Sequence, residues 1–324
     1  MLERLGLMPT QASTVAGDVD ALYLSLVALS VVFSVGIAAA LAFFAIRYRR
    51  RSEAHEAEQI HGSLALELVW SIIPFVIAMG IFVWGASLFI TLKRPPENAI
   101  EIFAVGKQWM WKLQHLEGRR EINELHVPVG TPVKVTLTSE DVIHSFFVPA
   151  FRVKQDAVPG RYSTVWFEAT QTGSFHLFCA EYCGTEHSLM IGTVTVMEPD
   201  DYQAWLSAGS GDGMAGPAHG DGPRSVAAAG GELFRDLRCH TCHRQAPGAL
   251  GPSLTNVFGA QVTLRGGGTV RADEAYLRES IVDPRAKLTE GYDPIMPTFQ
   301  GLVSEEGLMQ LVAYIKSLAA GQDT

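Results

Sequence analysis

The chain has 324 residues, a net charge of −9 and a hydrophobic fraction of 48%. Its length predicts two or three domains at roughly 150 residues each. The net negative charge argues against nucleic acid as a partner and is compatible with a basic protein partner. The hydrophobic residues are concentrated near the start of the chain.

Two long stretches near the N-terminus carry no charged residue. They are residues 21–46 and 68–92. Each is longer than the roughly 20 residues that a helix needs to cross the hydrocarbon core of a bilayer. Residues 1–94 are therefore expected to form an N-terminal tail and two transmembrane helices, at about 21–46 and 67–92.

A basic cluster follows the first apolar stretch. It contains Arg47, Arg49, Arg50 and Arg51. A secretory signal has a shorter apolar stretch and ends at small residues, so the pattern disfavours a cleaved signal. The positive-inside rule assigns the cluster to the cytoplasm. Both chain ends, and everything after residue 92, are then expected in the periplasm or on the outer face of a bacterial membrane.

Residues 95–206 are expected to form a β domain. Short runs rich in Val, Ile, Phe and Thr alternate with turn signals such as Pro159-Gly160 and Thr172-Gly173. This spacing predicts an antiparallel sandwich or barrel. The predicted strands are 99–105, 132–138, 163–169 and 191–197.

The last part of the chain changes character again. Residues 207–230 are rich in Gly, Ala and Pro, which predicts a flexible linker. Residues 231–324 are expected to form a small helical domain. Its last helix, 304–318, opens with Ser304 as the cap and two acids, which favour a helix N-terminus. One face is apolar, with Leu308, Leu311, Val312, Ile315 and Leu318.

The helical domain carries the sequence Cys-His-Thr-Cys-His at residues 239–243. C-x-x-C-H is the attachment signature of c-type haem. Cys239 and Cys242 are expected to form thioethers to the porphyrin, and His243 to bind the iron. A redox C-x-x-C would need a βαβ setting, and a zinc site would need two more ligands.

A haem iron bound by histidine takes a further ligand on its other side. Met296 is the expected one, in a rigid loop before Pro297. Met309 is the rival, but a methionine in an amphipathic helix more often packs in the core. His240 is too close to its own attachment site. A Met/His pair raises the reduction potential. With 251-GPSL-254, the region 226–320 resembles class I cytochrome c.

A second group of sulfur atoms lies in 179-CAEYCGTEHSLM-190. A disulfide would leave the histidine and methionine unexplained, and methionine is a poor zinc ligand. Copper accepts thiolate, thioether and imidazole. Two cysteines fit two bridged coppers, each with one imidazole: His187 from the cluster and His144 from another loop. His126 and His176 lie in strand-like runs that favour a structural role.

The pattern C-x-E-x-C-x3-H-x2-M with an upstream H-S-F resembles subunit II of the cytochrome c oxidases. The resemblance covers residues 20–198, including 108-QWMW-111 and 155-QDAVPGR-161. With the fused cytochrome c domain, the chain is similar to subunit II of the caa-type haem-copper oxidases. The resemblance implies a cupredoxin-like antiparallel β-barrel with a dinuclear CuA centre and an all-α class I cytochrome c domain.

The resemblance also implies roles for single residues. The carboxylate of Glu181 would reach a magnesium ion shared with subunit I. The presence of the copper ligands implies cytochrome c, rather than quinol, as the donor. The implied copper ligands are Cys179 and Cys183 as bridges, His144 and Met190 on one copper, and His187 and the Glu181 carbonyl on the other.

Three further residues belong to the same expectation. Trp109 matches the position at which the family receives electrons, whereas Trp111 is expected to pack in a hairpin. Glu67 is the only ionisable residue in 64–70. A carboxylate there is either a helix cap or, because intramembrane acids are often functional, a proton entry point toward subunit I.

The sequence thus predicts an electron-entry subunit that lies in the lipid bilayer and works with subunit I and subunit III of an oxidase. Its expected donor is cytochrome c or another external electron donor. Electrons would pass from haem c to CuA and on to the oxygen-reducing site of subunit I, with proton translocation. The alternative is a membrane-anchored electron carrier that serves a different reductase. A copper-storage protein would show methionine-rich runs, and the nine methionines are scattered.

Overall fold

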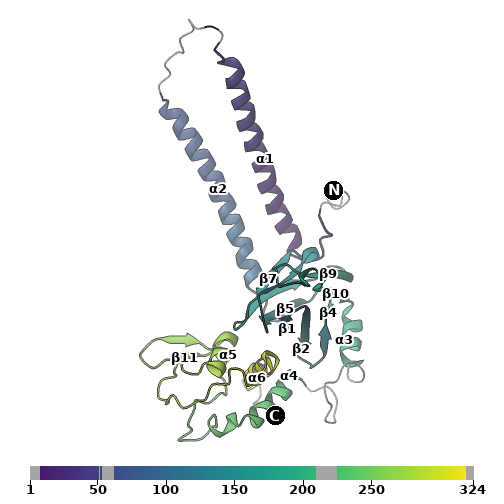
Figure 1. Ribbon diagram of the computed structural model, residues 1–324, viewed down its shortest axis with the longest axis vertical. Coiled ribbons are helices and arrows are strands. Elements are labelled where there is room, and N and C mark those ends of the chain that lie inside the picture. Colours follow the sequence, from purple (N-terminus) through teal and green to yellow (C-terminus); the bar gives the residue numbers. More distant parts are fainter. Residues whose placement is uncertain (1–7, 51, 53–61, 209–224, 319–324) are drawn as a thin grey trace. The chain divides into compact units, whose positions relative to one another are not determined.

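The computed structural model describes residues 8–50, 52, 62–208 and 225–318 (Figure 1). It divides into two compact units, Val15–Arg94 and Met1–Thr14 together with Pro95–Thr324. Arg51 of the basic cluster and residues 209–224 of the expected linker lie outside the described residues.

The first unit consists of two long apolar helices. Helix α1 spans Ala16–Arg47 and helix α2 spans Leu64–Lys93. Both are long and apolar enough to cross a membrane, and their most apolar windows are not buried by other parts of the protein. Both predicted helices are present, with ends a few residues beyond the expected ones. Glu67 lies in the first turn of α2, where a carboxylate interacts favourably with the helix dipole.

The β domain is a sandwich of two five-stranded sheets. Its strands are β1 (Ile100–Lys107), β2 (Met110–His115), β3 (Arg120–Ile122), β4 (Glu124–Pro128), β5 (Pro132–Ser139), β6 (His144–Val148), β7 (Val153–Ala157), β8 (Ser163–Glu168), β9 (Gly173–Cys179) and β10 (Ile191–Met197).

The two sheets have the strand orders β3-β2-β1-β5-β8 and β4-β10-β9-β6-β7. The expectation of a purely antiparallel domain needs a correction, because β1 pairs with β5 in parallel and β10 pairs with β4 in parallel. The four predicted strands are present. They alternate inward and outward, as in β5, where Val133, Val135 and Leu137 point into the core between the sheets.

The residues before α1 belong to the β domain. Ser13 forms a β-bridge with Ala169, and Thr170 N–H donates to the Ala12 carbonyl at 3.0 Å. The side chain of Ser13 donates to the Phe151 carbonyl at 2.8 Å. The start of the described chain is therefore held by the same domain that follows α2.

The boundaries expected for the linker need a second correction. Helix α3 (Pro199–Ala208) extends past residue 206, and helix α4 (Val226–Asp236) begins before residue 231. The small residues of α4 serve packing. A Cβ atom on Gly230 would lie 1.9 Å from the Gln310 carbonyl oxygen, so only glycine lets the two helices approach this closely.

The C-terminal domain contains the expected helices, but the expectation of an all-α domain needs a correction, because it also contains a short antiparallel hairpin. After α4 come the short helix η4 (Cys239–Thr241), the hairpin β11 (Gln261–Thr263) and β12 (Thr269–Arg271), and helices α5 (Glu274–Val282) and α6 (Glu305–Ser317). Ser304 caps α6 by accepting from Gly307 N–H at 3.1 Å. The predicted apolar face of α6 enters the core of this domain, with α4 and α5 beside it.

Candidate functional site

The sulfur-rich segment 179–190 folds as a loop between β9 and β10. Cys179 ends β9, and Met190 immediately precedes β10. His144 reaches the same place as the first residue of β6, the strand that pairs with the end of β9. Strand pairing therefore brings together ligands that are 35 residues apart in the chain.

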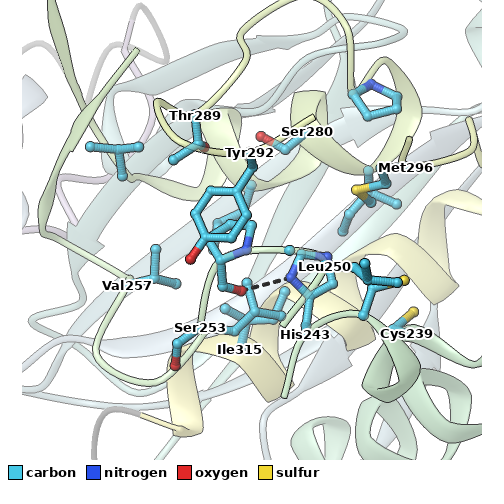
Figure 2. Close-up of a pocket in the computed structure, with 18 of the residues that line it drawn as sticks. Cys239, His243, Leu250, Ser253, Val257, Ser280, Thr289, Tyr292, Met296 and Ile315 are labelled. Carbon is cyan, nitrogen blue, oxygen red and sulfur yellow. Dashed lines mark hydrogen bonds between the residues drawn. The ribbon is translucent and has the colours of Figure 1, made fainter. Parts of the chain in front are cut away.

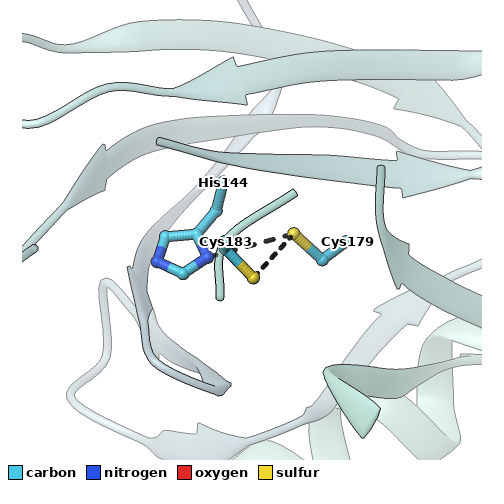
Figure 3. Close-up of side chains that lie close together, drawn as sticks. All are labelled: His144, Cys179 and Cys183. Carbon is cyan, nitrogen blue, oxygen red and sulfur yellow. Dashed lines mark hydrogen bonds between the residues drawn. The ribbon is translucent and has the colours of Figure 1, made fainter. Parts of the chain in front are cut away.

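The side chains of this loop converge on one point. Cys179 Sγ lies 3.8 Å from Cys183 Sγ, and His144 Nδ1 lies 3.9 Å from Cys179 Sγ (Figure 3). Around Cys183 Sγ, His187 Nδ1 lies at 3.4 Å and Met190 Sδ at 3.9 Å. The carbonyl oxygen of Glu181 lies 3.2 Å from Cys179 Sγ. All six predicted ligands thus meet in one cluster.

The two cysteines are free thiols. Their 3.8 Å separation is far from the roughly 2.05 Å of a disulfide bond. The ligand atoms of His144, Cys179 and Cys183 all lie within 4.8 Å of one another. Two soft sulfurs beside imidazole nitrogens fit copper, and a pair of sulfurs between two imidazoles fits two copper ions with shared thiolates.

The orientation of His144 is set by Asp141. Nε2 of His144 lies 2.8 Å from Asp141 Oδ1. A carboxylate only accepts, so Nε2 carries the proton and the lone pair of Nδ1 faces Cys179. Asp141 is held in turn by Gln108 N–H, which donates to Oδ2 at 2.8 Å.

The pKa values of the two thiols are shifted in opposite directions. Burial raises the pKa of Cys179, but the hydrogen bond with His144 outweighs it and lowers the pKa below the usual thiol value. Burial raises the pKa of Cys183 further, together with the charge of Cys179. A bound cation would favour the deprotonated form of both cysteines and displace their protons.

Several of the predicted copper ligands are shielded from water. His144 is fully buried, and Cys183 and Met190 are 2% and 1% exposed. Trp109 lies over the loop and is partly buried. Its indole N–H donates to the Cys183 carbonyl at 3.3 Å, and the Gln108 side chain donates to the same oxygen at 2.7 Å. Trp111 packs in the core against His144, as expected for a structural residue.

Gly106 was not singled out by the sequence analysis. A Cβ atom there would lie 2.8 Å from Cδ2 of His144, so the imidazole occupies the space that a side chain would fill. A glycine inside a strand often marks such a close approach, which is the signal that could have found it.

The C-terminal domain contains a cavity of about 800 Å³ (Figure 2). Cys239, Cys242, His243 and Met296 line it together with apolar side chains from α5 and α6. Met309 does not line the cavity and is buried in another cluster, a position that favours Met296 over Met309 as the ligand. The apolar walls, two thiols, an imidazole and a thioether fit covalently attached haem c.

His243 is oriented by the Gly-Pro-Ser-Leu segment. Its Nδ1 lies 2.8 Å from the Pro252 carbonyl oxygen, and a Cβ atom on Gly251 would lie 2.9 Å from the imidazole. Because a carbonyl only accepts, Nδ1 carries the proton and Nε2 keeps its lone pair for an iron. The neighbouring His240 is exposed outside the cavity.

The other weighed histidines lie outside both sites. His176 is exposed on β9. His126 interacts with Glu121, which also accepts from His115 Nε2 at 2.8 Å. The sequence analysis missed this buried His–Glu–His group, because its members meet only through the pairing of β2 with β3 and the turn into β4.

Three family models match the chain in sequence order. They are the transmembrane domain of cytochrome c oxidase subunit II at residues 3–88, the periplasmic domain of the same subunit at 116–197, and cytochrome c oxidase, cbb3-type, subunit III at 225–315. The subunit II domain implies CuA copper, and the cytochrome domain implies haem c.

Similar proteins support the same layout. Cytochrome c oxidase subunit 2 of Alkalihalophilus pseudofirmus is 32% identical over 309 residues, which cover 92% of this chain and 86% of the relative. The alternative cytochrome c oxidase subunit 2 of Bradyrhizobium diazoefficiens is 36% identical over 162 residues, covering 40% and 57%.

Among solved structures, the periplasmic domain of subunit II of cytochrome oxidase from Bradyrhizobium japonicum is 34% identical. It covers 36% of this chain and 96% of that chain, with a TM-score of 0.35. The long match to the Alkalihalophilus protein runs through both the membrane and the cytochrome parts of the chain. The chain therefore belongs to the cytochrome c oxidase subunit II family, and it carries a cytochrome c domain fused behind the copper domain.

Proposed function

We propose that this chain is the electron-entry subunit of a caa-type cytochrome c oxidase. It would accept electrons from an external cytochrome c at its own haem and deliver them to the oxygen-reducing site of subunit I. The observation that carries the proposal is the convergence of six side-chain and backbone ligands at one cluster, on the same chain as a cavity lined by Cys239, Cys242, His243 and Met296.

Cys179 and Cys183 would bridge two coppers, with His144 and Met190 completing one and His187 and the Glu181 carbonyl the other. When bound, the copper pair and the haem supply carriers that gain and lose one electron at a time. The protein holds the ligands in fixed positions and keeps most of them away from water. Asp141 orients His144, and Gln108 with Trp109 pins the loop through the Cys183 carbonyl.

Other roles in the oxidase follow from position. Trp109 is partly buried over the copper loop and is proposed as a point of electron entry. The exposed carboxylate of Glu181 is proposed to bind a magnesium ion shared with subunit I. Glu67, in the first turn of α2, is proposed as a proton entry point toward subunit I. Subunit III is a further proposed partner.

The proposed location is a bacterial cell membrane, with the copper and haem domains on the periplasmic or outer face. Arg47 in the last turn of α1, followed by Arg49 and Arg50, favours the cytoplasm for the loop between the helices. The hydrogen bonds of residues 12–14 with the β domain support this proposal, because two membrane crossings would leave residues 12–14 and the β domain on the same side.

The copper assignment is tested by electron paramagnetic resonance on the purified full chain. We expect one unpaired electron shared over two copper nuclei. The His144→Ala variant should lose this spectrum because it removes one imidazole. The control is His176→Ala, which removes an exposed histidine on β9, the neighbouring strand of the same sheet. A spectrum of a single isolated copper in the unchanged protein would contradict the proposal.

The haem assignment is tested by a pair of methionine variants. Met296→Leu should remove the long-wavelength absorption band of sulfur-to-iron ligation and lower the midpoint potential, because a thioether ligand raises it. Met309→Leu should leave both unchanged, since Met309 lies outside the cavity. If the two variants behave in the opposite way, Met309 is the ligand and the assignment is wrong.

A further inference from the structure

Helix α6 has two buried faces. Leu311 and Ile315 line the cavity of the cytochrome domain. Met309 and Ala313, on another face of the same helix, are 1% and 6% exposed and belong to a different cluster. A helix at the surface of a domain normally buries one stripe and turns polar residues to water on the other. The second buried face therefore indicates a partner.

The partner face is the outer side of β1 in the copper domain. Ile102 and Ala104 point into the core between the sheets, so the alternation of a strand turns Phe103 and Val105 outward. Both outward side chains are nevertheless buried, at 1% and 4% exposure. They form one apolar patch with Met309, Ala313 and Val226, and Tyr162 packs beside it.

Four charged side chains form a closed ring beside this patch. Lys134 Nζ lies 2.9 Å from Glu101 and 3.1 Å from Glu274, and Lys316 Nζ lies 2.6 Å from Glu101 and 2.9 Å from Glu274. Glu101 and Lys134 belong to the copper domain, and Glu274 and Lys316 to the cytochrome domain. Two of the four ion pairs therefore stay within a domain, and two cross between the domains.

The ring is partly removed from water. Its side chains are 12% to 21% exposed, so the ion pairs are screened less than surface pairs. Burial alone would raise the pKa of Glu274, but Lys316 and Lys134 outweigh it and lower the pKa to about 2. A buried guanidinium adds a further cross-domain interaction to these two ion pairs, because Arg278 Nη1 donates to the Gly160 carbonyl at 2.6 Å.

We propose that the outer face of β1 and β5 is a docking surface for the cytochrome domain of the same chain. Helix α6 is the docking element, the apolar patch supplies contact area, and the ring of Glu101, Lys134, Glu274 and Lys316 selects the docked position.

Docking leaves the mouth of the cavity open. Leu250 and Ile295 line the cavity and are 51% and 54% exposed while the domains are in contact. The docked domain thus keeps an apolar rim available to an external electron-donor protein. This consequence rests on the proposed function, whereas the docking surface itself does not.

The test uses three charge variants of the full, metal- and haem-loaded chain in detergent. Glu101→Lys with Lys134→Glu keeps the net charge and the ion pair within the copper domain, but makes both cross-domain pairs repulsive. Glu274→Lys with Lys316→Glu does the same from the cytochrome domain. The variant with all four substitutions restores every attraction with the signs reversed.

Hydroxyl-radical oxidation of Met309, read by mass spectrometry, reports docking, because Met309 is covered by the copper domain. Oxidation should rise several-fold in each double variant and return to the starting level in the fourfold variant. Met190 is the internal control, since its burial in the β domain does not depend on docking. Soret absorption checks that the haem domain is folded.

Two results would overturn the proposal. One is rapid oxidation of Met309 in the unchanged protein while Met190 stays protected, which would mean that the domains are apart. The other is oxidation of Met309 that is equal in all the proteins, or that stays high in the fourfold variant with normal Soret absorption, which would mean that the ring does not select the position. A chain that docks but accepts no electron from ferrocytochrome c would instead contradict the proposed function alone.

Discussion

At the scale of single residues, the copper cluster depends on neighbours that hold the ligands in place. His144 is fully buried between Asp141, which accepts from Nε2, and the backbone of Gly106. Such supporting residues restrict the imidazole to one orientation and one protonation pattern, which a metal ligand needs. Glycine at position 106 is thus part of the geometry of the site.

Gly106→Ala should disturb copper binding. The added Cβ would meet the His144 ring at 2.8 Å, and the imidazole is fully buried. We expect about 10–100-fold weaker copper binding, the usual effect of changing a supporting residue. Competition with a chelator measures it. The control is Lys107→Ala, the exposed next residue of β1. Equal copper affinity in both variants would contradict the role of Gly106.

At the scale of elements, helix α3 is the clearest addition to the sequence prediction. It follows β10 and packs back on the β domain through Tyr202, which is 1% exposed, and Trp205. Trp205 stacks on His126 and lies under the guanidinium of Arg119. The apolar face of α3 consists of few residues, and the helix borders a Gly- and Ala-rich region. The hydrophobic pattern of α3 is therefore too short to be recognised from the sequence alone.

Tyr202→Phe should destabilise the β domain. The Tyr202 hydroxyl donates to His115 Nδ1 at 3.1 Å, because His115 Nε2 donates its proton to Glu121. Without the hydroxyl, a buried acceptor loses its partner, which costs about 1–3 kcal/mol in the free energy of unfolding. Denaturant titration measures this. Tyr182→Phe serves as the control because Tyr182 is 76% exposed. An unchanged free energy of unfolding for Tyr202→Phe would show that the bond is unimportant.

At the scale of the whole molecule, the docking of the cytochrome domain should depend on salt more than on pH. The pKa values of Glu101 and Glu274 are lowered from 4.5 and that of Lys134 is raised from 10.5: burial opposes each shift, and the neighbouring opposite charges outweigh it. The contribution of the two glutamates to docking is fully present above pH 4.5 and is lost as the pH falls toward their lowered pKa values. That of Lys134 is present below 10.5 and is lost as the pH rises through the raised value.

We therefore expect constant protection of Met309 from about pH 5 to about pH 10, when its oxidation is normalised to that of Met190. Potassium chloride at about 1 M should increase the oxidation within this range, because the Debye length falls to about 3 Å and the partly exposed ring is screened. The fourfold charge variant should respond in the same way. A steep loss of protection between pH 7 and pH 5 would show that a different titrating group controls docking.

The sequence alone determined the elements that are encoded by short, continuous patterns of residues. Uninterrupted apolar length identified α1 and α2, alternation identified β1, β5, β8 and β10, and the spacing of sulfur and imidazole residues predicted both candidate sites. These patterns are readable because a membrane span, a pleated strand and a metal site each impose a short-range requirement on the chain.

Tertiary structure decided what depends on residues that are far apart in the chain. It separated Met296 from Met309 by placing one in the cavity and the other between two domains. It turned part of the expected linker into α4, because Gly230 is needed where that helix crosses α6. It also joined Glu101 to Lys316 across 215 positions. The role of a charged residue or a glycine depends on the residue that folding places beside it. A local sequence pattern does not predict which residue that is.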